Sequence, residues 1–159
     1  MQHPTAEDGF AVNQLVADSP PLDRNSVYCN LLQCSHFADT SVIAKDGDTD
    51  EVVGFISGYR IPARTDTIFV WQVVVSAKAR GQGLASRMLQ ALVDAESCRE
   101  VSYMETTITR DNKASWALFH KLAESLEAPV HDSVLFDKEI HFGGQHDSEM
   151  LVRIGPFSH

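Results

Sequence analysis

The fold of this chain is decided by one segment, which reads Val73-Val74-Val75-Ser76-Ala77-Lys78-Ala79-Arg80-Gly81-Gln82-Gly83-Leu84-Ala85. Its apolar start predicts a buried strand, and its end predicts a helix that opens on a glycine-containing turn. The first backbone N–H groups of a helix have no partner within it and coincide with the positive end of its dipole. Glycine allows close approach, and Arg80 adds a fixed positive charge. The turn therefore indicates a site for an anionic phosphate.

This turn does not match either of two common nucleotide motifs. A Walker loop, G-x-x-x-x-G-K-[ST], is absent from the sequence. A dinucleotide fingerprint would need a third glycine and an acidic residue about 20 positions further on. Taken alone, an R-G-x-G turn is more often a plain loop, so the phosphate interpretation depends on the rest of the chain. What remains is a pyrophosphate site of another kind.

The hydrophobic pattern predicts helices and strands that alternate along the chain. A first helix is expected after the capping pattern Thr5-Ala6-Glu7-Asp8, and a second after Asn25 or Ser26. Two further helices are expected from Leu84 and from Asp111 or Asn112. Strands are expected at 40–44, 52–59, 67–75, 101–107, 133–136 and 149–154. The predicted class is α/β (α+β), a mixed sheet flanked by helices in one domain, residues 1–159.

Composition narrows the class of protein. The net charge of −9 argues against nucleic acid as a partner, because phosphate binding needs a basic face. No apolar run approaches the ~20 residues of a membrane span, and the first ten residues do not resemble a signal peptide. Three cysteines without a C-x-x-C pattern predict reduced thiols. We therefore expect a soluble, cytoplasmic protein without membrane or nucleic-acid partners.

Two motifs resemble those of the GNAT superfamily of acetyltransferases. Residues 80–85 match its Q/R-x-x-G-x-G/A turn, and residues 112–119 match N-x-x-A-x-x-L-Y with Ser115 for Ala and Phe119 for Tyr. In that family the turn holds the pyrophosphate of coenzyme A, and the preceding strand lies beside the pantetheine arm. The resemblance implies a mixed, mostly antiparallel sheet and acetyl-CoA as co-substrate, without a metal. The residues it implies for acetyl-CoA binding are Val73, Val74, Val75, Arg80, Gly81, Gln82, Gly83, Leu84, Ala85, Asn112 and Phe119.

Longer strings resemble one family within that superfamily, the L-2,4-diaminobutyrate acetyltransferases. They include LDRNSVYCNLLQCSHFADTSVIA, VGFISGYRIP, DTIFVWQV, ETTITRDNKASWALF and HFGGQHDSEMLVRIGPF, and the likeness runs from about residue 5 to 157. It implies acetylation of the γ-amine of diaminobutyrate in ectoine biosynthesis by direct attack in a ternary complex, and a homodimer. Two alternatives stay open. One is acetylation of another small diamine or polyamine, and the other is a non-catalytic sensor that binds acyl-CoA.

A diamino acid substrate sets the chemistry that its site must supply. Ammonium groups are recognised by carboxylates and by aromatic faces, the latter through cation–π contacts of ~0.5–2 kcal/mol. The candidates for substrate binding are Asp23, Asn25, Trp71 and Gln72. Asp23 could instead be an ordinary helix-start residue, and Trp71 could belong to the core.

Catalysis needs a base, because an ammonium has no lone pair with which to attack a thioester. We rank Glu149 first as this base, Glu105 second and His146 third. A backbone N–H near Val73 or Val74 is expected to stabilise the developing oxyanion. His141, His146, Asp147 and Glu149 match no zinc spacing, so no metal is expected. Because Phe119 lacks a hydroxyl, the thiolate is protonated by Tyr28, Tyr59, Tyr103 or water, or it leaves unassisted.

Overall fold

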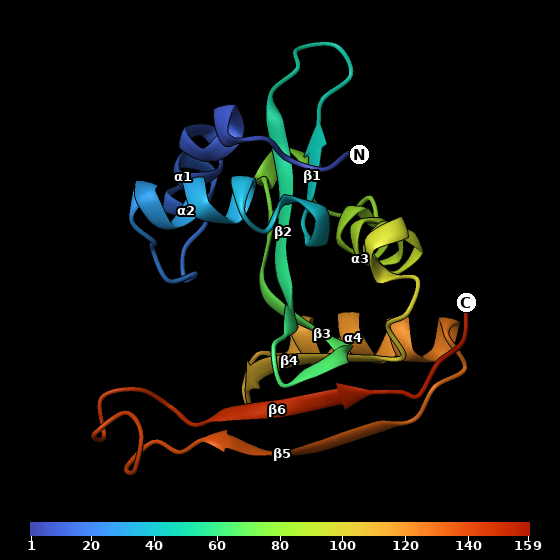
Figure 1. Ribbon diagram of the computed structural model, residues 1–159. Coiled ribbons are helices and arrows are strands. Elements are labelled where there is room, and N and C mark those ends of the chain that lie inside the picture. The colour runs from blue at the N-terminus through green and yellow to red at the C-terminus, as the bar shows by residue number, and fades with distance from the viewer.

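The structure, a computed structural model, describes residues 1–159 and contains one six-stranded sheet with helices on both faces (Figure 1). The strands lie in the order β1-β2-β3-β4-β6-β5. Only β3 and β4 pair in parallel, and every other neighbouring pair is antiparallel. The predicted mixed, mostly antiparallel sheet is therefore confirmed.

The helices are α1 (Gly9–Ala17), α2 (Val27–Ser35), α3 (Leu84–Asp94) and α4 (Lys113–Ser125). The strands are β1 (Val42–Lys45), β2 (Val52–Ile61), β3 (Arg64–Val75), β4 (Tyr103–Thr109), β5 (Val130–Phe136) and β6 (Glu149–Ile154). Four short 3₁₀ segments complete the chain: Ala6–Asp8, Ala38–Thr40, Ala77–Ala79 and Glu96–Cys98. No helix is both long enough and apolar enough to cross a bilayer.

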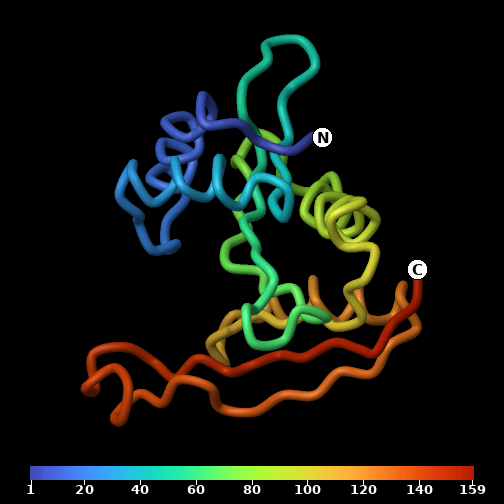
Figure 2. Tube along the Cα trace, in the orientation of Figure 1, coloured from blue at the N-terminus to red at the C-terminus, as the bar shows by residue number.

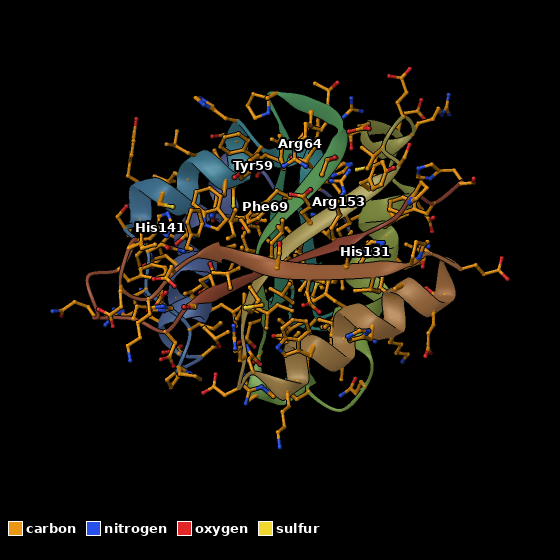
Figure 3. The ribbon with its side chains drawn as sticks, turned by 90° about the horizontal axis from the view of Figure 1, so that it is seen from below. Tyr59, Arg64, Phe69, His131, His141 and Arg153 are labelled. Atoms are coloured by element: carbon orange, nitrogen blue, oxygen red, sulfur yellow. The ribbon has the colours of Figure 1, made fainter.

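Two layers of helix cover opposite faces of the sheet because successive strand residues point to opposite sides. On β2, Phe55 packs with α1 and α2, whereas its neighbour Ile56 packs with α3 and α4. Figure 2 traces this division: the N-terminal helix pair lies on one side of β1–β3 and α3 on the other. The contacts of α1 and α2 with the sheet core stop at β3. The part of that face that carries Arg64, Phe69 and Arg153 is left without a helix over it (Figure 3).

A fork in the sheet sets the position of the site. Strand β3 pairs with β4 only through residues 67–69, opposite 103–105. Beyond Phe69, β3 continues along β2, and β4 continues along β6. The two halves of the sheet therefore run in different directions, as Figure 1 shows. The edge of β3 that faces β4 has no strand beside it from Val70 onward.

Several predicted boundaries are wrong, for physical reasons that the structure shows. Strand β3 begins at Arg64 instead of residue 67 because Pro62 and Ala63 form a tight turn that prolongs the hairpin. Val101 was expected to begin a strand, but it is a buried core residue in the turn before β4. Strand β5 begins at Val130 instead of 133. Residues 131–133 are polar and exposed, and only their pairing with β6 makes them part of a strand.

Candidate active site

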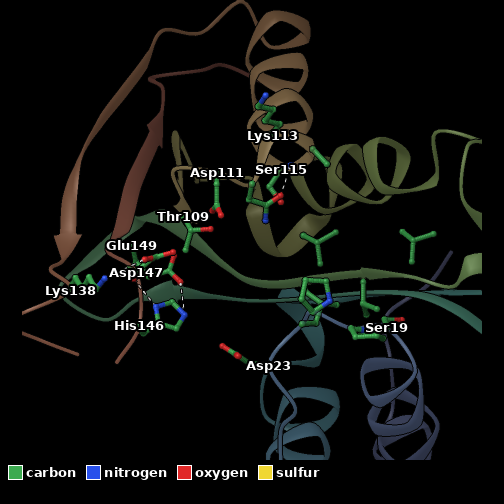
Figure 4. Close-up of a pocket in the computed structure, with 18 of the residues that line it drawn as sticks. Ser19, Asp23, Thr109, Asp111, Lys113, Ser115, Lys138, His146, Asp147 and Glu149 are labelled. Carbon is green, nitrogen blue, oxygen red and sulfur yellow. Dashed lines mark hydrogen bonds and ion pairs between the residues drawn. The ribbon is translucent and has the colours of Figure 1, made fainter. Parts of the chain in front are cut away.

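A cleft of about 990 Å³ opens at the fork between β3 and β4 (Figure 4). Four segments form its walls: the end of β3, the α1–α2 connection, the start of α4 and the β5–β6 loop. These segments are far apart in the sequence, and the fork brings them together. The lining residues are 19–23, 73–75, 80, 109, 111–115, 138, 144–147 and 149.

The β3 edge supplies free backbone groups to this cleft. The N–H of Ser76 donates to the Val53 carbonyl of β2 at 2.8 Å. Since backbone groups alternate in direction along an antiparallel strand, the N–H of Val74 also faces β2. The N–H and C=O groups of Val73 and Val75 then face the fork. An extended chain that carries amide groups can pair with this edge as an additional strand would.

The glycine-containing turn leads from β3 into α3 through two residues with left-handed backbone. Gly81 has φ +77° and Gly83 has φ +70°, in the left-handed region, and Gly83 is the N-cap of α3. The space around both positions is open, since an added Cβ would meet nothing within 4 Å. The first N–H groups of α3 are therefore accessible to an anion. Arg80, which donates from Nε to the Val75 carbonyl at 3.4 Å, lies on the cleft wall beside them.

The start of α4 forms a second helix N-terminus on the cleft. The Asn112 side chain caps the helix, with its Oδ1 accepting from the N–H of Ser115 at 3.2 Å. Lys113 also lines the cleft, so Arg80 and Lys113 provide two cationic side chains for phosphate groups. The cradle fits coenzyme A: a free strand edge for pantetheine amides, a glycine turn for the pyrophosphate and nearby positive charge.

The α1–α2 connection places Asp23 on the opposite wall. Two side-chain hydrogen bonds join this connection to β3: Asn25 Nδ2 donates to Gln72 Oε1 at 2.9 Å, and Gln72 Nε2 donates to the Asp23 carbonyl at 3.4 Å. Asn13 on α1 holds the connection from behind by donating to the Asn25 carbonyl at 2.8 Å. Asn25 and Gln72 thus fix the backbone that carries the Asp23 carboxylate.

Glu149 and His146 face Asp23 across the cleft (Figure 4). Glu149 is the first residue of β6, and its Oε1 lies 4.0 Å from His146 Nε2. Burial raises the pKa of Glu149, and the negative charge of Asp23 adds to the rise. The His146 charge and a hydrogen bond with Thr107 oppose it without cancelling it. The site therefore holds a carboxyl group that binds a proton more readily than an exposed glutamate does.

The imidazole of His146 has a defined orientation. Its Nδ1 lies 2.6 Å from the Asp147 carbonyl, and because a carbonyl only accepts, Nδ1 carries a proton and donates. The Phe142 ring packs on it, with the centroids 4.6 Å apart. Nε2 is left to face Glu149.

Glu105 does not line the cleft, contrary to the role that its sequence position suggested. It is 2% exposed, and its carboxylate accepts hydrogen bonds from Arg64 and Arg153. Burial acts to raise the pKa of Glu105, but the two guanidinium groups outweigh burial and hold the pKa below its ordinary value. A carboxylate with such partners is a poor proton acceptor, so the structure argues against Glu105 as the base.

Two other predicted residues lie in surroundings that the sequence did not indicate. Phe119, predicted to contact acetyl-CoA, is 3% exposed and belongs to the core beneath α3 and α4, as Leu84 does. Trp71 is 45% exposed, so the core alternative for it is wrong. It is the extra residue of a β-bulge, since Ser57 pairs with Gln72 and Gly58 with Val70. Its ring meets that of Tyr59 edge to face, with the centroids 6.1 Å apart.

The structure adds cleft residues that the sequence did not single out. Lys113 directly follows the helix cap Asn112. A basic residue at the start of a helix beside a predicted phosphate site could have been identified from the sequence as a candidate phosphate contact. Lys138 and Gln145 come from the β5–β6 loop, whose return to the cleft depends on tertiary structure. None of the three tyrosines lines the cleft. No group of three or more His, Cys, Asp or Glu residues is arranged to hold a metal ion.

Comparison with known proteins identifies relatives along the whole chain. The sequence model of the Acetyltransferase (GNAT) family matches residues 11–123. The L-2,4-diaminobutyric acid acetyltransferase of Methylotuvimicrobium alcaliphilum is 57% identical over 157 residues, which cover 99% of this chain and 90% of that protein. The enzyme of the same name from Vibrio parahaemolyticus is 48% identical, with 96% and 83% covered.

Solved structures show the same fold. The diaminobutyrate acetyltransferase of Paenibacillus lautus, in complex with its substrate L-2,4-diaminobutyric acid and coenzyme A, superposes with a TM-score of 0.93 at 40% identity. The match covers 99% of this chain and 95% of that one. The ribosomal-protein-S18-alanine N-acetyltransferase of Escherichia coli matches with a TM-score of 0.73 at 11% identity, which is a likeness of fold alone.

Proposed function

Because this chain belongs to the acetyltransferase (GNAT) family and, within it, to the L-2,4-diaminobutyric acid acetyltransferases, we propose that its cleft joins acetyl-CoA and L-2,4-diaminobutyrate in one complex. The enzyme transfers the acetyl group to the γ-amine and gives 4-N-acetyl-L-2,4-diaminobutyrate, a step of ectoine biosynthesis. The observation that carries this assignment is the fork, where a free β3 edge faces the acidic pair Asp23 and Glu149.

Acetyl-CoA occupies the side of the cleft formed by β3 and the two helix starts. The pyrophosphate lies at the turn of residues 80–85, and the pantetheine amides pair with Val73 and Val75. Lys113 and Asn112, at the start of α4, face the nucleotide end. This placement puts the thioester beside Gln72 and Val73, at the end of the cleft where β3 and β4 begin to separate.

Diaminobutyrate occupies the opposite side. Its two ammonium groups need negative partners, which Asp23 and Glu149 supply across the cleft. The exposed Trp71 ring offers a face for cation–π contact, and Asn25 and Gln72 hold the Asp23 segment in place. Since the substrate carries net positive charge, the acidic wall also favours its approach.

The reaction is a direct attack of amine on thioester. Glu149, directly or through water and with His146 beside it, accepts the proton of the γ-ammonium. The neutral amine forms a bond to the thioester carbonyl carbon, and the fork-facing N–H of Val73 donates to the carbonyl oxygen as it gains charge. The carbon–sulfur bond breaks and coenzyme A leaves, while the acetylated nitrogen releases its remaining extra proton to water, which gives the neutral amide. With no tyrosine on the cleft, coenzyme A leaves as a thiolate, which is an acceptable leaving group at an ordinary thiol pKa of ~8.5.

The sensor alternative loses its support in the structure. Its only support in the sequence was Phe119, which stands at the tyrosine position of the N-x-x-A-x-x-L-Y motif. Phe119 is buried in the core, so its missing hydroxyl does not bear on the cleft.

The proposed oligomer is a homodimer. Strand β5 is an edge strand with six exposed residues in succession, 131–136. It presents Val134, Leu135 and Phe136, and Ile140 beyond them is 81% exposed. An unpaired apolar edge of this kind is suited to a second copy. Light scattering on the purified protein tests this assembly, and Leu135→Lys should shift it toward a monomer.

The proposed location is the cytoplasm, and the proposed organisation is one domain over residues 1–159. Three free cysteines and a cytoplasmic co-substrate support the location. A single sheet that includes both the first and the last strand supports one domain. Cell fractionation checks the first proposal, and a single cooperative unfolding transition checks the second.

The substrate assignment is tested with a panel of amines. Purified enzyme, acetyl-CoA and a thiol reagent report coenzyme A release with diaminobutyrate, ornithine, lysine and putrescine. We expect kcat/KM to be highest for diaminobutyrate. A higher kcat/KM for putrescine would show that the enzyme acetylates a polyamine and that the carboxylate of the substrate is not recognised.

A further inference from the structure

An ion cluster around a buried carboxylate lies on the sheet face beside the cleft and has no part in the chemistry above. Its centre is Glu105, whose Oε1 accepts from Arg64 Nη2 at 3.0 Å and whose Oε2 accepts from Arg64 Nη1 at 2.5 Å. Arg153 Nη1 also donates to Oε2. The side chains of Arg64 and Arg153 are 47% and 29% exposed, whereas that of Glu105 is 3% exposed. One carboxylate is thus held by two guanidinium groups.

The three residues come from three different strands. Arg64 begins β3, Glu105 lies in β4 and Arg153 lies in β6. Arg64 reaches Glu105 because the β2–β3 pairing is irregular there: Arg60 pairs with Ile68, and Ile61 pairs with Arg64. Arg64 and Arg153 appear together on this face in Figure 3, beside Tyr59 and Phe69. The cluster therefore links the two halves of the forked sheet.

The cluster lies at the point along the strands where β3 and β4 begin to separate. Phe69 and Glu105 are the last residues paired between β3 and β4. One residue further, the Thr106 hydroxyl donates to the Val70 carbonyl at 3.0 Å, and beyond this bond the strands separate. Across the other edge of β4, the ladder with β6 pairs Glu105 directly with Arg153. Glu105 is thus bonded at the point from which the two cleft walls diverge.

Arg153 is itself held on two sides. Its guanidinium carbon lies 3.8 Å from the centroid of the Tyr103 ring, and its Nη1 lies 3.5 Å from Thr67 Oγ1. Along β6, residues 149, 151 and 153 point to the same face. Arg153 and Glu149 are four residues, about 13 Å, apart along the strand, so the cluster cannot touch the reacting groups. It can act on them only through the position of β6.

We infer that Glu105, together with Arg64 and Arg153, is a positioning element that fixes the opening of the fork and hence the spacing between the coenzyme A wall on β3 and the Glu149 wall on β6. The inference rests on the proposed function of the fork as the acetyl-CoA site. A plain stabilising ion cluster would have no reason to affect coenzyme A binding in the folded protein. A positioning cluster must affect it, because both walls depend on the Glu105 bonds.

The test compares Glu105→Gln with Asp8→Asn. Asp8 forms a partly buried ion pair with Lys45 at 3.0 Å, remote from the cleft-lining residues, so Asp8→Asn is a matched loss of a carboxylate. Calorimetric titration with coenzyme A alone and steady-state kinetics are both measured well below the melting temperatures. For Glu105→Gln we expect Kd for coenzyme A and KM for acetyl-CoA to rise by about ten- to a hundredfold, the scale of effect of a ~1 Å misplacement. For Asp8→Asn both should stay unchanged.

Other outcomes overturn the inference. An unchanged Kd and KM in Glu105→Gln, with only a lower melting temperature, would make the cluster merely stabilising. Loss of the acid limb of the pH–rate profile in Glu105→Gln would make Glu105 the base.

If Glu105→Gln does not fold, Arg153→Lys keeps the central charge and should show the same rise in Kd to a smaller degree. A wild-type enzyme that binds coenzyme A without acetylating diaminobutyrate would refute the proposed function, and the Kd comparison would still decide this inference.

Discussion

His146 Nε2 lies 4.0 Å from Glu149 Oε1, and both groups face Asp23 across the cleft (Figure 4). Because His146 donates from Nδ1 to a backbone carbonyl, its free Nε2 is directed toward the Glu149 carboxylate. A positively charged His146 lowers the pKa of Glu149, whereas burial and Asp23 raise it. The γ-ammonium of the substrate enters this balance as a further positive charge.

Replacement of the proposed base should abolish most of the turnover. In Glu149→Gln the amide cannot accept the ammonium proton, and we expect kcat to fall by about 10²–10⁴-fold, as for other general bases. KM for acetyl-CoA should change little, since Glu149 lies on the opposite wall. Glu124→Gln, on the exposed side of α4, is the matched control and should leave both constants unchanged. If Glu149→Gln keeps wild-type turnover across pH, carboxylate base catalysis by this residue is excluded.

The pH–rate profile should reflect the raised pKa of Glu149. As pH rises through this pKa, the active carboxylate forms, so kcat/KM should increase along an acid limb whose midpoint lies above the ordinary glutamate value. His146→Gln removes the positive partner that lowers the pKa of Glu149, so the limb should shift to higher pH. A limb at the ordinary glutamate value in the wild type, unmoved by His146→Gln, would contradict the assignment.

The same pKa shift predicts an effect on stability. A carboxyl group whose pKa is raised on folding contributes stability below its unfolded pKa and loses it as pH rises through the folded pKa. Near neutral pH the wild type has lost this contribution, whereas Glu149→Gln carries no charge to desolvate. Denaturant unfolding at neutral pH should therefore show Glu149→Gln to be at least as stable as the wild type. A clear destabilisation would mean that the Glu149 charge is favourable in the folded protein.

A left-handed glycine at the helix start should be required for coenzyme A binding. Gly83→Ala places a side chain at φ +70°, at an expected cost of about 1–2 kcal/mol in the free energy of unfolding. It also introduces a methyl group beside the proposed pyrophosphate, so Kd for coenzyme A should rise beyond what instability explains. Gly47→Ala has equally open space and no positive φ, and it should change neither quantity. Equal effects of the two substitutions on Kd would count against the pyrophosphate site.

The cysteines should not interfere with thiol-based assays of coenzyme A release. Burial, together with the Asp8 charge, raises the pKa of Cys34 to about 12, and burial raises the pKa of Cys98. Both side chains are almost fully buried, whereas Cys29 is partly exposed. Titration of native protein with a thiol reagent at pH 8 should therefore label at most Cys29. Rapid labelling of Cys34 would show that the α1–α2 layer over the sheet opens readily, and rapid labelling of Cys98 would show that the core on the α3 side does.

The coenzyme A side of the site was largely predictable from sequence because it is local. Val73, Val74, Val75 and Arg80 line the cleft, and the predicted turn contains Gly81 and Gly83 with left-handed backbone. A strand, a turn and a helix that follow one another in the chain need no tertiary information to form this cradle. The role of Asn112 as a helix cap was equally predictable, because a cap and its helix are neighbours in the sequence.

The acceptor side depended on tertiary structure. Glu105 and Glu149 are both acidic residues on sheet strands. The sequence ranked them first and second as candidates for the base, with Glu149 first, but it could not show how different their surroundings are. Only the fold shows that Glu105 lies between two arginines and that Glu149 faces the cleft. Trp71 projects because of a β-bulge, which depends on the register with β2. The predicted first residues of β3 and β5 were wrong for the same reason, because the pairing with neighbouring strands decides where these strands begin.

The most direct test of the account is the structure of the product. Purified enzyme is incubated with acetyl-CoA and L-2,4-diaminobutyrate, and NMR spectroscopy determines which nitrogen carries the acetyl group. We predict 4-N-acetyl-L-2,4-diaminobutyrate as the main product, with Glu149→Gln reducing its rate of formation. Acetylation of the α-amine, or no acetylation of diaminobutyrate by enzyme that binds coenzyme A, would contradict the central claim.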